Sequence, residues 1–338
     1  MDRRRQSHRG VAAFRTVQQA MSVAGLIMLA MALVAAGAIM APAQAKPPGP
    51  NGQIVFARDD PALGDTVVYT ANPDGSHMHR LLPGFTAESP HWSPDGSEVA
   101  VASGLGATDC CPYSAVIVNP DTGGYRALPM QDPAVFTFCT IWSVNGRRLA
   151  CDGGNDSDPS VNGVYTIRSS DGGGLKRLTN AHGGHDLPID YSPSGKRLVF
   201  ARTGPFGCDK HSALYVIRLD GRGLHRITPW GFCDDDGSWS PEGTRIAFEH
   251  RGSLFVVHPD GRGLAKIPLV THGRSFAGDF TWSPNGNKLV FLLITQTAAH
   301  SFQEGIATAN ADGTHIRQIS NSPTFDHMTD WGTHPLAH

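Results

Sequence analysis

The chain has 338 residues, of which 40% are hydrophobic and only 17% charged, and its formal net charge is −2. Its 39 Gly and 24 Pro residues are typical of many short strands joined by tight turns rather than of long helices. The near-neutral charge, without a run of Lys or Arg after the first fifteen residues, argues against nucleic-acid binding.

The first 45 residues have the features of an export signal. A basic start around Arg3, Arg4 and Arg5 is followed by an apolar stretch over residues 21–41, and Ala43-Gln44-Ala45 fits the small-x-small cleavage pattern. The alternative is an uncleaved membrane anchor, because about 20 apolar residues can span a bilayer. We therefore expect a protein that is secreted or held in the cell envelope or periplasm. It would contact a membrane only through an uncleaved N-terminal segment.

After a Pro-rich linker at residues 46–50, one turn motif recurs along the chain. It consists of an aromatic residue followed by Ser-Pro-x-Gly or a close variant. The aromatic anchors recur every 43 to 50 residues and are Trp92, Trp142, Tyr191, Trp239, Trp282 and, in a degenerate copy, Trp331. Each anchor except the last is followed by a β-rich run. Five regular copies at this spacing indicate a structural repeat rather than isolated surface turns.

A second turn alternates with the first. It has an Asp-Gly or similar core and occurs at residues 72–75, 119–123, 170–172, 219–221, 258–261 and 310–313. Asp-Gly and Asn-Gly supply the positive φ angles of tight hairpins, and Pro presets the first turn dihedral. Two hairpins in each repeat of about 48 residues make the four antiparallel strands of one propeller blade.

The two ends of the repeat region complement each other. Residues 52–57 look like the strand that follows an anchor but have no anchor before them, whereas Trp331 has no strand after it. Joined, they make a sixth blade from a C-terminal inner strand and three outer strands within residues 52–82. The predicted fold is therefore an all-β, six-bladed β-propeller over residues 51–335, with mixed N- and C-terminal closure.

The repeat resembles the WD-like propeller repeats of the TolB-like family and of the propellers in prolyl oligopeptidases. The resemblance covers residues 51–335 and implies the fold much more strongly than a function. TolB carries a further N-terminal α/β domain, whereas only a few residues lie here between the predicted cleavage site and the first strand. The Gly-x-Ser-x-Gly elbow of the oligopeptidase hydrolase domain is missing from the sequence. The sequence therefore offers no candidate serine nucleophile of that kind.

The strand order places both kinds of turn on one face of the propeller, which we call the turn face. The longer connections lie on the opposite face, the loop face, and surround the mouth of the channel. The predicted ligand-binding residues on the loop face are His182, His185, Asp186, Asp234, Asp235, Asp236, Asp279, Asp326 and His327. Glu88, His91, Asp132 and Asp330 are predicted on the same face.

Two segments of the loop face contain possible metal ligands. His182 and His185, with Asp186, could bind a divalent metal, and His327 or Asp236 could complete the shell across the channel. Asp234, Asp235 and Asp236 could likewise attract Ca²⁺. The simpler interpretation of both segments is a solvated polar loop, because their spacing matches no established metal motif.

The six cysteines all lie after the predicted cleavage site, and none has the paired spacing of a zinc site. We expect a Cys208–Cys233 disulfide, because both residues lie in loops of one blade on the loop face. One of Cys110 and Cys111 should pair with Cys139, and the other with Cys151. The alternative pairs Cys139 with Cys151 across their hairpin and leaves a vicinal Cys110–Cys111 bond.

The loops on the loop face differ in length while the turns do not, which is typical of a rigid platform that presents binding loops. We therefore expect an exported, monomeric, non-enzymatic binding or scaffold protein without a cofactor. Its channel-mouth loops would recognise a protein, peptide or glycan. The alternative is a metal-assisted hydrolase or lyase acting on saccharides or esters, by analogy with oligogalacturonate lyases, which use a similar propeller with a metal at the channel. A purely structural role in the envelope is a third interpretation.

Overall fold

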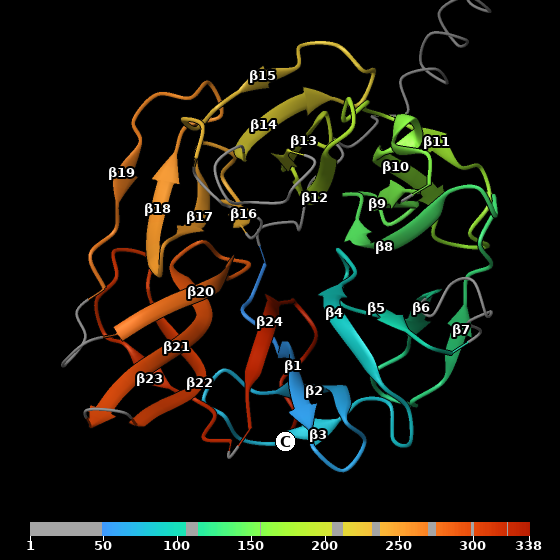
Figure 1. Cartoon of the computed structure of the whole chain (residues 1–338). Coiled ribbons are helices and arrows are strands. Elements are labelled where there is room, and N and C mark those ends of the chain that lie inside the picture. The colour runs from blue at the N-terminus through green and yellow to red at the C-terminus, as the bar shows by residue number, and fades with distance from the viewer. Residues whose placement is uncertain are drawn as a thin grey trace, which may run out of the picture. The chain divides into compact units, whose positions relative to one another are not determined.

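A computed structural model of the chain describes residues 49–105, 114–155, 157–204, 212–231, 237–269, 275–298, 301–322 and 324–338. Over these residues the chain forms 24 strands arranged in six four-stranded antiparallel sheets. The sheets stand around a common centre (Figure 1), so the predicted six-bladed propeller is confirmed. Within the described residues, no helix is long and apolar enough to cross a membrane. The predicted export signal lies outside them.

Each blade is named here with its innermost strand first. Blade 1 contains β24 (Asp326–Trp331), β1 (Ile54–Asp60), β2 (Asp65–Ala71) and β3 (His79–Arg80); blade 2 contains β4 (Ala87–Trp92), β5 (Val99–Ser103), β6 (Ser114–Val118) and β7 (Tyr125–Ala127); and blade 3 contains β8 (Phe136–Trp142), β9 (Arg148–Gly154), β10 (Gly163–Arg168) and β11 (Lys176–Arg177). Blade 4 contains β12 (His185–Tyr191), β13 (Arg197–Thr203), β14 (Ala213–Arg218) and β15 (His225–Arg226); blade 5 contains β16 (Gly237–Trp239), β17 (Ile246–His250), β18 (Ser253–Val257) and β19 (Ala265–Lys266); and blade 6 contains β20 (Ser275–Trp282), β21 (Lys288–Ala298), β22 (Ser301–Asn310) and β23 (Arg317–Gln318). A short 3-10 helix, Pro159–Val161, lies between β9 and β10.

Every inner strand ends at one of the predicted aromatic anchors, and all six anchors are buried. The turn that follows is held by its own residues. In blade 3, Ser143 Oγ accepts a hydrogen bond from the backbone N–H of Arg148 at 2.9 Å, and Gly146 takes a φ of 68°. A residue with a Cβ is disfavoured at such a φ, which explains the Gly that ends each of the five regular motifs. The anchors thus fix where each inner strand stops.

The propeller is closed by the two ends of the repeat region, as predicted. β24 pairs with β1, and Trp331 lies opposite Ile54. The residues after Trp331 continue across the turn face, where the His334 ring stacks on Trp92 of blade 2 with 5.0 Å between ring centroids. Ala337 N–H donates to Asn72 Oδ1 at 3.0 Å. The C-terminal segment therefore joins blade 1 to blade 2 as well as completing the sheet of blade 1.

Candidate functional site

The six inner strands surround a channel at the centre of the propeller. A narrow section of about 40 Å³ is lined by residues of all six, among them Trp92, Trp142, Asp190, Ser238, Thr281 and Asp330. Toward the loop face the channel widens into a chamber of about 220 Å³, whose lining includes Ser89, His91, Phe138, Asp152, Leu187 and Pro188. We call this space the channel chamber. His91, Ile141 and Ile189 line both sections, so the two spaces adjoin.

Bulges in the inner strands shape the wall of the channel. Three residues stand three positions before their anchors with positive φ angles: Ser89 (49°), Asp279 (53°) and Met328 (52°). The strand register shifts at the same places. Such a bulge bends and twists the strand, which redirects the residues that follow it. The inner strands therefore do not present a simple alternation of side chains to the channel.

Carboxylates of the inner strands bond to the neighbouring blade. Asp330 Oδ2 accepts the backbone N–H of Trp92, and Asp190 Oδ2 accepts that of Trp239, both at 2.8 Å. Asp279, predicted as a ligand-binding residue, accepts the N–H of Met328 at 2.8 Å. These hydrogen bonds run from one blade to the next and give the three carboxylates a role in fixing the blades around the channel.

Asp152 on β9 is the acidic residue in the chamber wall. Its Oδ1 atom is inaccessible to solvent and has no hydrogen-bond partner among the described residues. Burial raises the pKa of Asp152 from 3.8 to about 6; the charge of His185 opposes this rise, and that of Asp186 adds to it. An unpaired buried acceptor is costly to retain, and such groups concentrate at functional sites.

The strand position of Asp152 is occupied by Ala or Leu in four of the other five blades. Asp152 stands three residues after Leu149, which pairs with the anchor Trp142. The corresponding residues of blades 1, 2 and 4 are Ala57, Ala102 and Ala201, all buried. Blade 5 has Glu249, which accepts the N–H of Gly252 within its own hairpin, and blade 6 has Leu292. Sequence reasoning missed Asp152, although aligning the second strand of every blade reveals it.

Asp186, predicted as a ligand-binding residue, is fully buried in an ion pair. Arg202 Nε donates to its Oδ1 at 2.7 Å and Arg202 Nη2 to its Oδ2 at 2.8 Å. The Thr179 hydroxyl donates to Oδ2 at 2.6 Å. Both carboxylate oxygens are therefore used within blade 4 and its entry loop.

Blade 1 repeats this arrangement with Asp326, another predicted ligand-binding residue. Arg58 donates to both of its oxygens at 2.5 and 2.9 Å, and the Ser320 hydroxyl donates to Oδ2 at 2.5 Å. The Arg58 guanidinium lies 4.8 Å from the centroid of the Tyr69 ring, as Arg202 lies 5.2 Å from that of Tyr215. Two blades thus use the same acid, hydroxyl, arginine and aromatic set to join the first strand to the second.

The predicted histidine ligands do not meet in one cluster. His182 is exposed in a turn with a φ of 50°, whereas His185 begins β12 on the side of Asp152. His327 stacks on Phe325 with 5.1 Å between ring centroids, and its Nε2 lies 3.3 Å from Asp59 Oδ1. Among the described residues, no group of three His, Cys, Asp or Glu side chains could hold a metal. Asp234, Asp235 and Asp236 lie outside the described residues, so the predicted shells that include them stay predictions.

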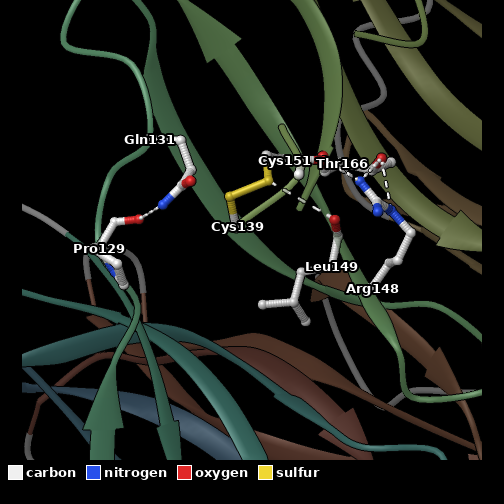
Figure 2. Close-up of a disulfide and its surroundings, with 8 residues drawn as sticks. Pro129, Gln131, Cys139, Arg148, Leu149, Cys151 and Thr166 are labelled. Carbon is white, nitrogen blue, oxygen red and sulfur yellow. Dashed lines mark hydrogen bonds between the residues drawn. A yellow bond between two sulfur atoms is a disulfide. The ribbon is translucent and has the colours of Figure 1, made fainter. Parts of the chain in front are cut away.

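A disulfide joins Cys139 to Cys151 (Figure 2), with an S–S distance of 2.05 Å. The preferred prediction, in which both pair with Cys110 and Cys111, is therefore wrong, and the alternative is confirmed for this pair. The reason is register, because β8 and β9 place the two cysteines directly opposite each other. The other predicted cysteines, Cys110, Cys111, Cys208 and Cys233, lie outside the described residues. The disulfide adjoins the chamber wall, because Phe138 and Asp152 are the next residues along the two strands.

Comparisons with known proteins agree with the fold. No family model matches the chain. An uncharacterised protein of Agrobacterium fabrum is 26% identical over 214 residues, which cover 59% of this chain and 67% of that protein. The structure of TolB from Acinetobacter baumannii matches with a TM-score of 0.63 and 18% identity, over 83% of this chain and 66% of TolB. A protein provisionally identified as TolB from Agrobacterium tumefaciens matches with a TM-score of 0.59 and 16% identity, over 82% of this chain and 91% of that one.

Other structures with the same propeller have different activities. They include an oligogalacturonate lyase and a puromycin-hydrolysing peptidase. A shared fold at such low identity does not transfer a function, so the function must be argued from the site. The described residues of this chain have the six-bladed β-propeller fold of TolB.

Proposed function

We propose that this chain is an exported binding protein whose channel chamber receives one basic side chain, or the N-terminal amine, of a peptide or protein partner. The observation that carries the proposal is the unpaired Oδ1 of Asp152 in the wall of a concave space. Oδ1 is closed to solvent in this structure, so the carboxyl has to turn that oxygen toward the chamber before a donor from a ligand can give it the partner that the described chain does not provide. Binding sites of this kind are mostly apolar, with a few polar groups that fix the orientation of the ligand.

The size of the chamber favours recognition of part of a ligand. Its volume of about 220 Å³ suits one side chain or a chain end, while the rest of the partner would lie on the surrounding loop face. Phe138, Leu187 and Pro188 supply apolar wall for the methylene stem of a long side chain. A sugar ring, in contrast, needs many hydrogen-bond partners, and the chamber offers few.

The charge of Asp152 favours a cationic group. With a pKa of about 6, the carboxyl is mostly ionised at neutral pH, although burial penalises the charge. An ammonium or guanidinium group would compensate this charge through a charge-assisted hydrogen bond, which is stronger than a neutral one. Affinity should therefore fall when the pH drops below 6 and Asp152 becomes protonated.

Selection from a random peptide library tests the proposal directly. A phage-displayed library is selected on the immobilised protein at pH 7.5, and binding of the selected peptides is measured by calorimetry. The Asp152→Asn variant removes the charge, and Asp132→Asn is the matched control, because Asp132 is a loop-face acid outside the chamber lining. We expect enrichment of peptides with Lys, Arg or a free N-terminus that bind Asp132→Asn normally. Their affinity for Asp152→Asn should be about tenfold lower, the equivalent of one hydrogen bond to a charged group.

Two outcomes would overturn the proposal. One is a set of selected peptides that bind Asp152→Asn as tightly as the unmodified protein. The other is a stoichiometric metal in the purified protein that is lost in a His185→Ala variant, which would favour the metal-assisted enzyme instead.

A further inference from the structure

A second cavity lies on the turn face, between blades 3 and 4. Its volume is about 480 Å³. The apolar part of its lining comes from Val144, Leu178, Tyr191 and Leu219. The cationic part comes from Arg147, Arg148, Arg168 and Lys176. We call this space the interblade groove; it lies on the face opposite the channel chamber, so the proposal below goes beyond the proposed function.

The groove lies beside the one anchor that is not a tryptophan. Tyr191 occupies the position held by Trp in the other five blades. A phenol ring is smaller than an indole, so it fills less of the space against the neighbouring blade. Tyr191 is buried, and it shares a hydrophobic cluster with Val144 while Leu178 and Leu219 pack against that cluster. The exchange of Trp for Tyr therefore accounts for open space at this particular junction.

An arginine that covers the anchor at two other junctions is turned away here. Arg197 lies over the Trp239 ring at 5.9 Å from the centroid, and Arg245 lies over the Trp282 ring at 4.8 Å. The equivalent residue of blade 3 is Arg148, six positions after its own anchor. It donates instead to Thr166 O at 2.8 Å and Gly174 O at 2.6 Å, and Figure 2 shows its bonds to Thr166. Arg148 is thus held at the side of the groove rather than over Tyr191.

The charges around the groove are unbalanced. None of its lining residues is acidic. Arg168 is paired with Asp171, whose Oδ2 lies 2.9 Å from Arg168 Nη2. Arg147 and Lys176 are both exposed, and neither forms an ion pair with a described residue. Burial raises the pKa of Tyr191, so its hydroxyl stays protonated at neutral pH. The groove therefore offers an apolar floor with unpaired cations at its edge.

We propose that the interblade groove binds a small amphiphilic anion, one carboxylate, sulfonate or phosphate group on an apolar body. The anionic group would bind to Arg147 and Lys176, and the apolar body would lie on Val144, Leu178 and Leu219 beside Tyr191. A volume of about 480 Å³ lies within the range of small-molecule sites. The apolar contacts would supply most of the affinity, and the cations would select for the charge.

Two dyes with related aromatic bodies separate the two parts of this recognition. The probes are 1-anilinonaphthalene-8-sulfonate, which is anionic, and N-phenyl-1-naphthylamine, which lacks the sulfonate. Their fluorescence is titrated against the full protein at low salt, where surface charges are least screened. The charge variant combines Arg147→Gln with Lys176→Gln. The matched control is Arg262→Gln, an exposed cation in the Asp-Gly turn of blade 5.

We expect the charge variant to weaken sulfonate binding about tenfold and to change binding of the neutral dye less than about twofold, since roughly 1.4 kcal/mol corresponds to a factor of ten. Tyr191→Trp should fill the groove, as the anchors of the other blades do, and weaken both dyes by about tenfold or more on the same scale. Arg262→Gln and Asp152→Asn should leave both affinities unchanged.

The thermal midpoint of each variant establishes that it is folded before its affinity is interpreted. If Tyr191→Trp does not fold, Leu219→Phe provides a second way to fill the groove. Unchanged dye binding by the folded filling variant overturns the proposal, as does equal loss of both dyes in the charge variant. Sedimentation with phosphatidylglycerol vesicles distinguishes a free amphiphile from a membrane surface. The proposal is also overturned if the unmodified protein binds vesicles, the charge variant does not, and the unmodified protein shows no saturable binding of the anionic dye.

Discussion

Asp152 lies directly opposite Phe138 across the β8–β9 strand pair, and both residues line the channel chamber. The adjacent pair, Cys139 and Cys151, is joined by the disulfide. The covalent link therefore holds together the two strands that carry one wall of the candidate site. Asp152 and the disulfide between Cys139 and Cys151 therefore both belong to blade 3.

Replacement of Asp152 should stabilise the protein at neutral pH. Its carboxyl has a pKa of about 6 in the folded chain against 3.8 as a free side chain. Between pH 3.8 and about 6 the folded state binds more protons than the unfolded state. The free energy of unfolding therefore falls as the pH rises through this range. Above pH 6 the buried carboxylate lowers the free energy of unfolding by about 3 kcal/mol, because one pKa unit corresponds to about 1.4 kcal/mol. Urea unfolding of Asp152→Asn should show a higher free energy at pH 7.5 and a smaller difference from the unmodified protein at pH 4.

The control for this prediction is Asp132→Asn, whose stability should follow that of the unmodified protein at both pH values. If the free energies of Asp152→Asn and the unmodified protein run parallel from pH 4 to 7.5, then the carboxyl does not carry the burial cost that we assign to it.

Loss of the Cys139–Cys151 disulfide should destabilise blade 3 and weaken ligand binding in the chamber. The two cysteines are 12 residues apart, and closing a loop of that length restricts the unfolded chain by about 2–3 kcal/mol. The double variant Cys139→Ala, Cys151→Ala should lose about that much free energy of unfolding in urea. Peptide mapping without reductant should give a linked pair of peptides containing Cys139 and Cys151. A link from either residue to Cys110 or Cys111 would show that the assigned pairing is incorrect.

Removing one partner of a repeated buried ion pair should be strongly destabilising. Asp186→Ala leaves Arg202 without its counter-charge, and Asp326→Ala does the same to Arg58. An uncompensated buried charge typically costs about 3–5 kcal/mol. The exposed pair of Arg168 and Asp171 provides the comparison, because Asp171→Ala should cost no more than about 1 kcal/mol. Thermal unfolding distinguishes the two classes, and a small effect of Asp186→Ala would remove the structural role and favour a ligand role.

The fold could be predicted from the sequence because its markers are local. A Ser-Pro-x-Gly turn after Trp92 depends on residues next to one another, and regular repetition makes chance matches improbable. The chamber depends instead on register and bulges, which bring together residues distant in the chain. Nothing local marks the positive φ of Ser89 or Met328. Asp152 could have been found only by aligning the second strands of all blades and noting an acid where three blades have Ala.

The roles of the predicted ligand residues depend on contacts between strands, which the local sequence does not reveal. Asp186 follows two histidines and glycines, which is the composition of a ligand-binding loop. Its partner Arg202, however, lies 16 residues away on β13, and the strand pairing brings the two together. Similarly, the spacing of Cys139 and Cys151 allowed two disulfide patterns, and only the β8–β9 register decides between them.

The pH dependence of peptide affinity tests the proposed function most directly. Calorimetric titrations of one selected basic peptide at pH 5 to 8 compare the unmodified protein with Asp152→Asn. We predict that affinity for the unmodified protein rises with pH and levels off above about 6, where Asp152 is ionised, whereas affinity for the variant is lower and does not change over this range. Equal affinities with identical pH profiles for the two proteins would contradict the assignment of Asp152 as the residue that anchors the ligand.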